Sequence, residues 1–176
     1  GLAYDLTYIN EGGANSDLEL CDLLPYNTEK AKTFHGAYGL KSVTVTVQNA
    51  DGTAINLGTD DITVKYAGTD SVAYNKGVLD HAATMQKAGF GTQLTNKTTQ
   101  GNSVTFPPDT MPIHKATGKS ELGSLYLQLK NLPNATVKVH VKLAVTQTKD
   151  DVNALLTDSD NTVQQSNDTY NNIYFA

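Results

Sequence analysis

Residues 124–147 read SLYLQLKNLPNATVKVHVKLAVTQ, and this stretch decides the fold. In its first half Leu125, Leu127 and Leu129 alternate with Tyr, Gln and Lys. In its second half every other residue is apolar, namely Val137, Val139, Val141, Leu143 and Val145. A strand points successive side chains to opposite faces, so a period of two predicts two strands that each bury one face. Because one apolar and one polar face is typical of antiparallel sheets, the stretch predicts an antiparallel β-sandwich.

The composition limits the size of the fold and the classes of partner. The chain has 176 residues, enough for one domain with a sizeable core. Its formal net charge is -5, and all 13 basic residues are lysines, so arginine is absent. Arginine is the usual residue for bidentate contacts to phosphates and base edges. Nucleic-acid binding is therefore not expected. A polar surface built mainly from uncharged side chains is typical of secreted proteins and of subunits of shells or filaments.

The single cysteine, Cys21, lies in the apolar run 17–24 and is expected to be a small buried side chain. The alternative is a catalytic or cross-linking thiol, but no motif surrounds it. No run of about 18 apolar residues is present, so we expect no membrane span. The sequence begins at Gly1 without a recognisable signal peptide, which suggests a processed or trimmed start.

Shorter segments repeat the alternation of the first stretch. Residues 49–52 end in Asp-Gly and predict the turn of a hairpin. Residues 18–24 could form either a strand or a helical turn. In chain order, the predicted strands are 2–8, 18–24, 41–48, 53–57, 62–66, 104–106, 124–130 and 136–147.

One helix is predicted between strands, over residues 75–88. Val78, Ala82 and Met85 recur there at helical spacing. The Asn at the start of the segment can cap the first turn, and Gly89 can follow the last one.

Together these segments predict an all-β protein. The expected fold is an antiparallel β-sandwich, or single jelly roll, with one short helix inserted between strands and extended terminal arms. Residues 1–156 form the predicted domain, which ends in a helical turn at 150–156. Residues 157–176 form a predicted C-terminal arm, irregular over 157–172.

Motifs for chemistry are weak. Thr117-Gly118-Lys119-Ser120 resembles the end of a phosphate-binding loop, but Ile113 stands where that motif needs glycine, so a surface turn is expected. The histidines have no metal-ligand spacing and are expected to be scattered; a site assembled from distant parts of the fold is the alternative. They are His35, His81, His114 and His140.

The paired carboxylates are expected to be solvated loop or helix-start charges. Asp60 and Asp61 are adjacent and would face opposite ways in a strand, and Asp150-Asp151 begins the last helical turn. Asp158-Ser-Asp160 has the opening of a calcium loop but lacks its later ligands, which leaves a weak calcium site between subunits as the alternative.

Three Asn-X-Thr triplets begin at Asn96, Asn134 and Asn167. They would matter only if the chain passes through a glycosylating compartment.

The C-terminal third resembles the end of single jelly-roll viral coat proteins. The shared pattern is a strand at 124–130, a short loop at Leu132–Ala135, a long closing strand at 136–147, and then a polar tail. The resemblance implies an icosahedral shell of packed barrels that exchange terminal arms, and thus a virion protein. Its partners would be copies of itself and other coat proteins of the particle. Many such proteins carry a basic N-terminal arm for the genome, and this chain has none.

Both chain ends are candidate subunit contacts. The tail ends in large apolar side chains after a polar stretch, whereas an unanchored tail is normally polar. It could dock on its own barrel as an edge strand, or it could extend a neighbour's sheet. The first strand could do the same from the other end. The predicted interface residues are Leu2, Tyr4, Leu6, Ile173, Tyr174 and Phe175.

The leading functional hypothesis is therefore a structural, self-assembling capsid subunit, with no catalytic residues and no cofactor. The first alternative is an extracellular filament (pilin-like) or adhesin subunit that uses strand exchange. The second is a carbohydrate-binding β-sandwich module, although the absence of Trp removes the usual aromatic platform. An enzyme is the last alternative. It would require a cluster of His35, His81 or His114 with acids in a pocket.

Overall fold

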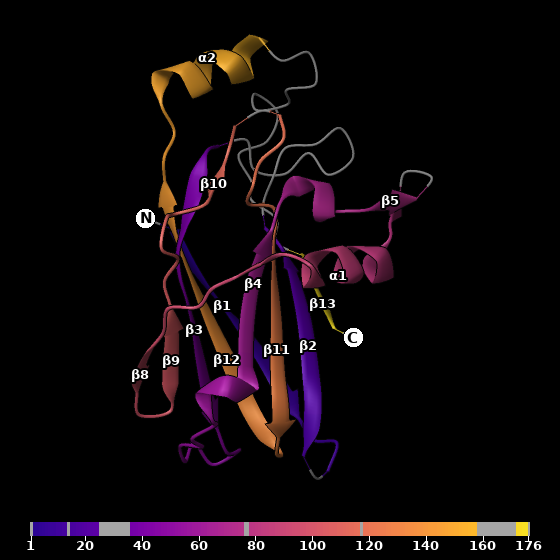
Figure 1. Ribbon diagram of the computed structural model, residues 1–176, viewed down its shortest axis with the longest axis vertical. Coiled ribbons are helices and arrows are strands. Elements are labelled where there is room, and N and C mark those ends of the chain that lie inside the picture. Colours follow the sequence, from indigo (N-terminus) through magenta and orange to yellow (C-terminus); the bar gives the residue numbers. More distant parts are fainter. Residues whose placement is uncertain are drawn as a thin grey trace.

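The computed structural model consists of two antiparallel sheets packed face to face (Figure 1). It describes residues 2–13, 15–24, 36–75, 78–116, 118–157 and 172–175. The predicted antiparallel β-sandwich is confirmed. His35, Asn167, the pair Asp158 and Asp160, and most of the predicted irregular tail lie outside the described residues.

Within the described residues, sheet A contains six strands and sheet B contains five. The strands of sheet A, in spatial order, are β1 (Leu2–Asn10), β12 (Ala135–Val145), β3 (Tyr38–Gln48), β9 (Ser103–Phe106) and β8 (Thr98–Gln100), with β10 (Ile113–His114) also paired to β3. The strands of sheet B are β13 (Asn172–Phe175), β2 (Ser16–Leu23), β11 (Ser124–Leu132), β4 (Ile62–Ala67) and β7 (Thr92–Gln93).

The strand order is that of a jelly roll. Eight strands of the described chain make up its two four-stranded layers: β1, β2, β3, β4, β7, β9, β11 and β12. Numbered one to eight along the chain, they lie in the order 1-8-3-6 in sheet A and 2-7-4-5 in sheet B. Consecutive strands thus mostly alternate between sheets, as two nested Greek keys require.

The core lies between the two sheets. The leucines of β11, and Val137, Val139, Val141 and Leu143 of β12, point inward and are almost completely buried, as their alternation predicted. Val145, at the end of β12, is 54% exposed, so the prediction that it is buried is wrong. The outer face of sheet A is polar. There the hydroxyls of Thr44 and Thr105 lie 2.9 Å apart, and those of Thr46 and Ser103 lie 2.7 Å apart. The stretch that opened the sequence analysis therefore supplies central strands of both sheets.

Helix α1 (His81–Gly89) packs against the outer face of sheet B (Figure 1). The helix is shorter than the predicted 75–88 segment. It begins after Asp80, whose side chain accepts a hydrogen bond from Ala83 N at 2.9 Å. The predicted capping residue Asn75 instead belongs to a small hairpin of β5 (Tyr74–Asn75) and β6 (Val78–Leu79). Asp80, and not Asn75, therefore caps the start of the helix.

The predicted hairpin strand at 53–57 is wrong. That segment contributes only an isolated bridge, between Gln48 and Ala54. The reason is that both edges of β3 are already occupied, by β12 on one side and by β9 on the other. Short strands β7, β8 and β10 lie outside the strands that the sequence predicted.

The remaining connections carry short helical turns. Asp60 and Asp61 belong to the 3₁₀ turn η1 (Thr59–Asp61), and a second turn, η2 (Thr69–Ser71), follows β4. Helix α2 (Lys149–Thr157) begins with a reciprocal cap, because Thr148 N donates to Asp151 Oδ2 at 2.7 Å and Asp151 N donates to Thr148 Oγ1 at 3.2 Å. Asp151 thus has a structural role.

Substitution of Leu127 tests the core assignment. Leu127 is fully buried at the centre of β11. We expect Leu127→Ala to lower the free energy of unfolding by about 2–5 kcal/mol, because it removes buried methyl groups and leaves a cavity. Exposed Lys130 on the same strand is the control, and Lys130→Ala should change stability by no more than about 0.5 kcal/mol. Denaturant unfolding of both variants measures the difference; equal effects would contradict the assignment.

Candidate assembly site at the terminal strands

The first strand, β1, forms one edge of sheet A and pairs along its full length with β12, from Leu2 opposite Leu143 to Asn10 opposite Ala135. Tyr4 and Leu6 are half-buried and pack against the core. Leu2 is 39% exposed. The strand therefore covers the core from one side, and among the described strands it is the last one on that side of the sheet.

The last described strand, β13, forms one edge of sheet B. It pairs antiparallel with β2, with Ile173 opposite Asp22, Tyr174 opposite Cys21 and Phe175 opposite Leu20. Within a single chain, the tail thus takes the position of an edge strand on its own sandwich. Any second chain that presented the same segment could make the same backbone pairing.

The two terminal strands lie on the same side of the sandwich. The Tyr4 hydroxyl of β1 donates a hydrogen bond to the Asp22 carboxylate of β2, the strand that pairs with β13. At the other end of β1, Asn10 Nδ2 donates to Ser16 Oγ at 3.2 Å and to Pro133 O at 2.9 Å. Of the predicted interface residues, Tyr4 therefore contacts β2 through its side chain, and Ile173, Tyr174 and Phe175 pair with β2 through the backbone.

Asp22 is the residue that sequence reasoning missed. Its side chain occupies an inward position in a run that otherwise reads Leu18, Leu20 and Leu24, and it is fully buried. The interruption of an apolar alternation by a carboxylate was the available signal, because a buried charge needs a partner. Tyr4 provides one such partner from the opposite sheet.

The thiol of Cys21 is buried on the outer face of sheet B beneath α1, as expected. Burial, with a smaller contribution from the Asp22 charge, raises its pKa to about 12. The thiol is therefore protonated at neutral pH, which argues against a catalytic role.

A second buried polar pair lies next to Asp22. Burial, and secondarily the charge of Asp22, raises the pKa of Tyr38. The Tyr38 ring stacks on His114, with ring centroids 4.7 Å apart. His114 Nδ1 lies 3.0 Å from the Leu122 carbonyl oxygen, which can only accept, so the Nδ1 carries the proton. Burial lowers the pKa of His114 although this hydrogen bond opposes the shift.

Two other residues that the sequence analysis considered for chemistry, His140 and Ser120, interact with neighbouring residues of the fold. His140 lies on the polar face of sheet A, and its Nδ1 lies 2.7 Å from Asp5 Oδ1. Ser120, the last residue of the segment that resembles a phosphate loop, accepts a hydrogen bond from Lys115 N at 2.7 Å. Both side chains therefore bind neighbouring parts of the fold.

The carboxylates of the described residues do not gather into a metal site. Asp60 forms an ion pair with Lys97 at 3.6 Å. Within the described ranges, no three His, Cys, Asp or Glu side chains lie together in a way that could hold a metal ion.

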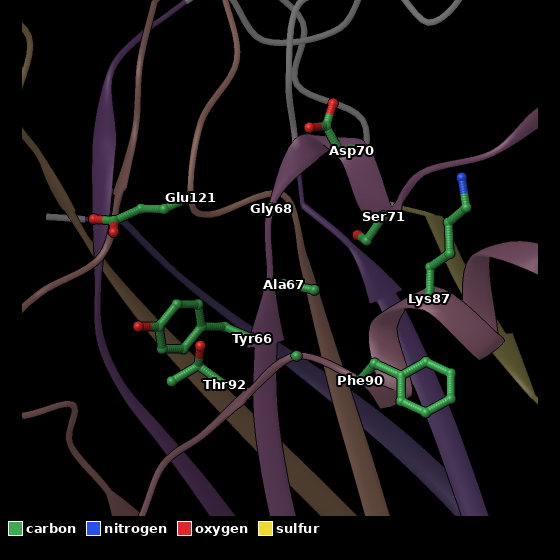
Figure 2. A pocket seen from close by; sticks show the side chains of 10 residues that line it. Tyr66, Ala67, Gly68, Asp70, Ser71, Lys87, Phe90, Thr92 and Glu121 are labelled. Atoms are coloured by element: carbon green, nitrogen blue, oxygen red, sulfur yellow. The ribbon is translucent and has the colours of Figure 1, made fainter.

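A shallow hollow of about 550 Å³ lies beside the C-terminal end of α1. Its three charged side chains point in different directions in Figure 2: Glu121 points to one side of β4, and Asp70 and Lys87 point away from Glu121. None of the three described histidines, at positions 81, 114 and 140, lines it. It therefore lacks the convergent polar groups that acid–base or nucleophilic chemistry requires.

Comparison of the sequence with protein families and with curated proteins finds no match. Among the described helices, none is long and apolar enough to cross a membrane. The fold and the terminal strands are therefore the basis for the functional proposal below.

Removal of the Tyr4 hydroxyl tests the contact between the sheets. We expect Tyr4→Phe to lower the free energy of unfolding by about 1–3 kcal/mol, because the buried Asp22 carboxylate loses a donor. Thr7→Val removes a hydroxyl from the exposed face of the same strand and should have little effect. Denaturant unfolding compares the two, and an equal loss in both variants would contradict a specific role for Tyr4.

The buried His114 predicts acid sensitivity. Its folded-state pKa lies below the ordinary value of 6.5, so the unfolded chain binds the proton more readily. Stability should therefore be fully present above about pH 6.5 and decrease as pH falls towards the lower folded-state pKa. Melting temperatures between pH 8 and pH 4 measure this slope. In His114→Gln the slope should flatten, and an unchanged slope would show that other groups cause it.

Proposed function

We propose that the protein is a structural subunit that assembles with copies of itself, and that the assembly is a capsid-type shell of jelly-roll subunits. In such a shell the protein would be a virion component without a cofactor. Its partners would be further copies of the same chain and other coat proteins of the particle. Association would depend on complementary surfaces and strand pairing.

The observation that carries the proposal is the position of the two chain ends. β1 and β13 are edge strands of different sheets, and both adjoin the same flank of the sandwich. Edge strands expose unpaired backbone groups, so they must be covered or paired with another chain. Exchange of an identical terminal element between protomers keeps every native pairing and changes only the chain that provides it.

The strand order supports the shell-forming class without being specific to it, because jelly rolls also occur in lectins and other binding proteins. The same terminal exchange could produce a filament if the rotation between subunits does not close. Negative-stain microscopy separates these forms: closed particles support the shell, and open fibres support the filament subunit.

The lone cysteine allows a direct test of exchange by β13. Position 174 lies opposite Cys21 in the β13–β2 register. Directly opposed strand residues are close enough for a disulfide after modest adjustment. In Tyr174→Cys, we expect oxidised assemblies to contain covalent dimers and longer species on non-reducing gels, because the introduced thiol of one copy pairs with Cys21 of another.

Phe175→Cys is the matched control. It places a thiol one residue further along the tail, opposite Leu20, which has no thiol to bond. This variant should give no specific disulfide. If every assembled fraction of Tyr174→Cys instead runs only as a monomer with an internal disulfide, β13 does not exchange and the proposed mechanism is wrong.

A further inference from the structure

The most exposed large apolar side chain among the described residues is Phe90, which is 84% exposed at the end of α1. Its backbone is held on both sides. Lys65 Nζ donates to Gly89 O at 2.8 Å, and Phe90 N donates to Lys87 O at 3.2 Å. A Cβ on Gly91 would lie 2.2 Å from Tyr66 O, so the chain passes directly against β4 there. A rigid backbone thus presents an aromatic ring to solvent.

Phe90 borders the hollow beside α1 described above. Figure 2 shows Lys87 and Phe90 on one side of β4, and Glu121 and Tyr66 on the other. The surface is therefore divided: a cation and a projecting ring lie on one side, and an anion and a second ring lie on the other. Asp70, which also lines the hollow, forms an exposed ion pair with Lys119 at 3.5 Å.

We propose that this surface is a twofold contact between two copies of the chain. In a twofold contact the same patch occurs on both subunits and must complement itself. A twofold axis along β4, in the plane of the contact, exchanges the two sides of the hollow (Figure 2). Lys87 of each copy then faces Glu121 of the other, and Phe90 of each copy enters the other's hollow beside Tyr66.

The charges and the rigidity favour a second copy as the occupant. Lys87 and Glu121 are both exposed, and Glu121 accepts a hydrogen bond from Ile113 N through Oε1. Phe90 has only two side-chain torsions on a backbone that is held in place, so it loses little conformational freedom on binding. The contact is small, so the dimer should be weak and dependent on concentration.

The twofold contact rests on the proposed function in one respect: its partner is another copy of the chain. It lies near the β4–β7 edge of sheet B, whereas the terminal strands lie at the β13–β2 edge. One subunit could therefore make both contacts at once, and each can be tested without the other.

Charge reversal of the full-length chain tests the contact. In Lys87→Glu, a twofold dimer places the introduced carboxylate against Glu121 twice. In Glu121→Lys it places the introduced ammonium group against Lys87 twice. Each variant alone should associate at least about tenfold more weakly than the wild type, because like charges oppose each other. In a mixed dimer of the two variants, each introduced charge faces an opposite charge on the other chain. The mixture should therefore regain association, as measured by sedimentation velocity.

If association returns in the mixture, both variants must be folded, so misfolding cannot explain the loss of association in each variant alone. Lys130→Glu, which reverses a charge outside the hollow, should associate like the wild type, and Phe90→Ser should weaken association without loss of stability. The proposal is overturned if the mixture is no tighter than the single variants, or if the wild type shows no association at any concentration.

The two contacts fail separately. If the mixture fails while Tyr174→Cys still forms cross-links to Cys21 of another chain, only this contact is wrong. If the mixture succeeds and those cross-links are absent, only strand exchange is wrong.

Discussion

The structure depends on one constraint: two sheets with apolar inner faces must be closed at their edges. On one flank the chain ends provide this closure, with β1 at the edge of sheet A and β13 at the edge of sheet B. The hydrogen bond from Tyr4 to the buried Asp22 links the two sheets at that flank. Because Asp22 is fully buried, departure of β1 would leave its carboxylate without this donor. A replacement strand therefore needs a hydroxyl at the same position, which an identical chain provides.

The opposite part of sheet B is covered differently. There α1, which extends across β2, β11 and β4, ends at Phe90, which remains exposed beside the hollow. In the proposed assembly, strand exchange at one edge of sheet B and the twofold contact near the other edge would give the chain two independent contacts with its copies. A twofold contact alone ends at a dimer, so a larger assembly that includes it needs a second kind of contact.

The sequence predicted the sandwich because alternation in residues 124–147 is strong and the inward residues are large. It failed where local patterns competed with tertiary pairing. The segment after the Asp51-Gly52 turn looks like a hairpin strand, but β9 already occupies the edge of β3. Val78 fits the helical spacing by coincidence, and the Asp80 cap starts α1 later. The placement of β1 and β13 at the sheet edges depends on the topology of the whole chain, so local sequence patterns could not predict it. The contact of Tyr4 had one signal in the sequence, which is the carboxylate of Asp22 in an otherwise apolar run.

The most direct measurement of the central claim is the absolute mass of the purified protein, by light scattering, for the full chain and for a chain that ends at Asn172. The account predicts a large, defined assembly for the full chain and much smaller species for the shortened chain, since the shortened chain loses most of β13. A full chain that remains a monomer, or a shortened chain that assembles equally well, would contradict assembly through the terminal strands.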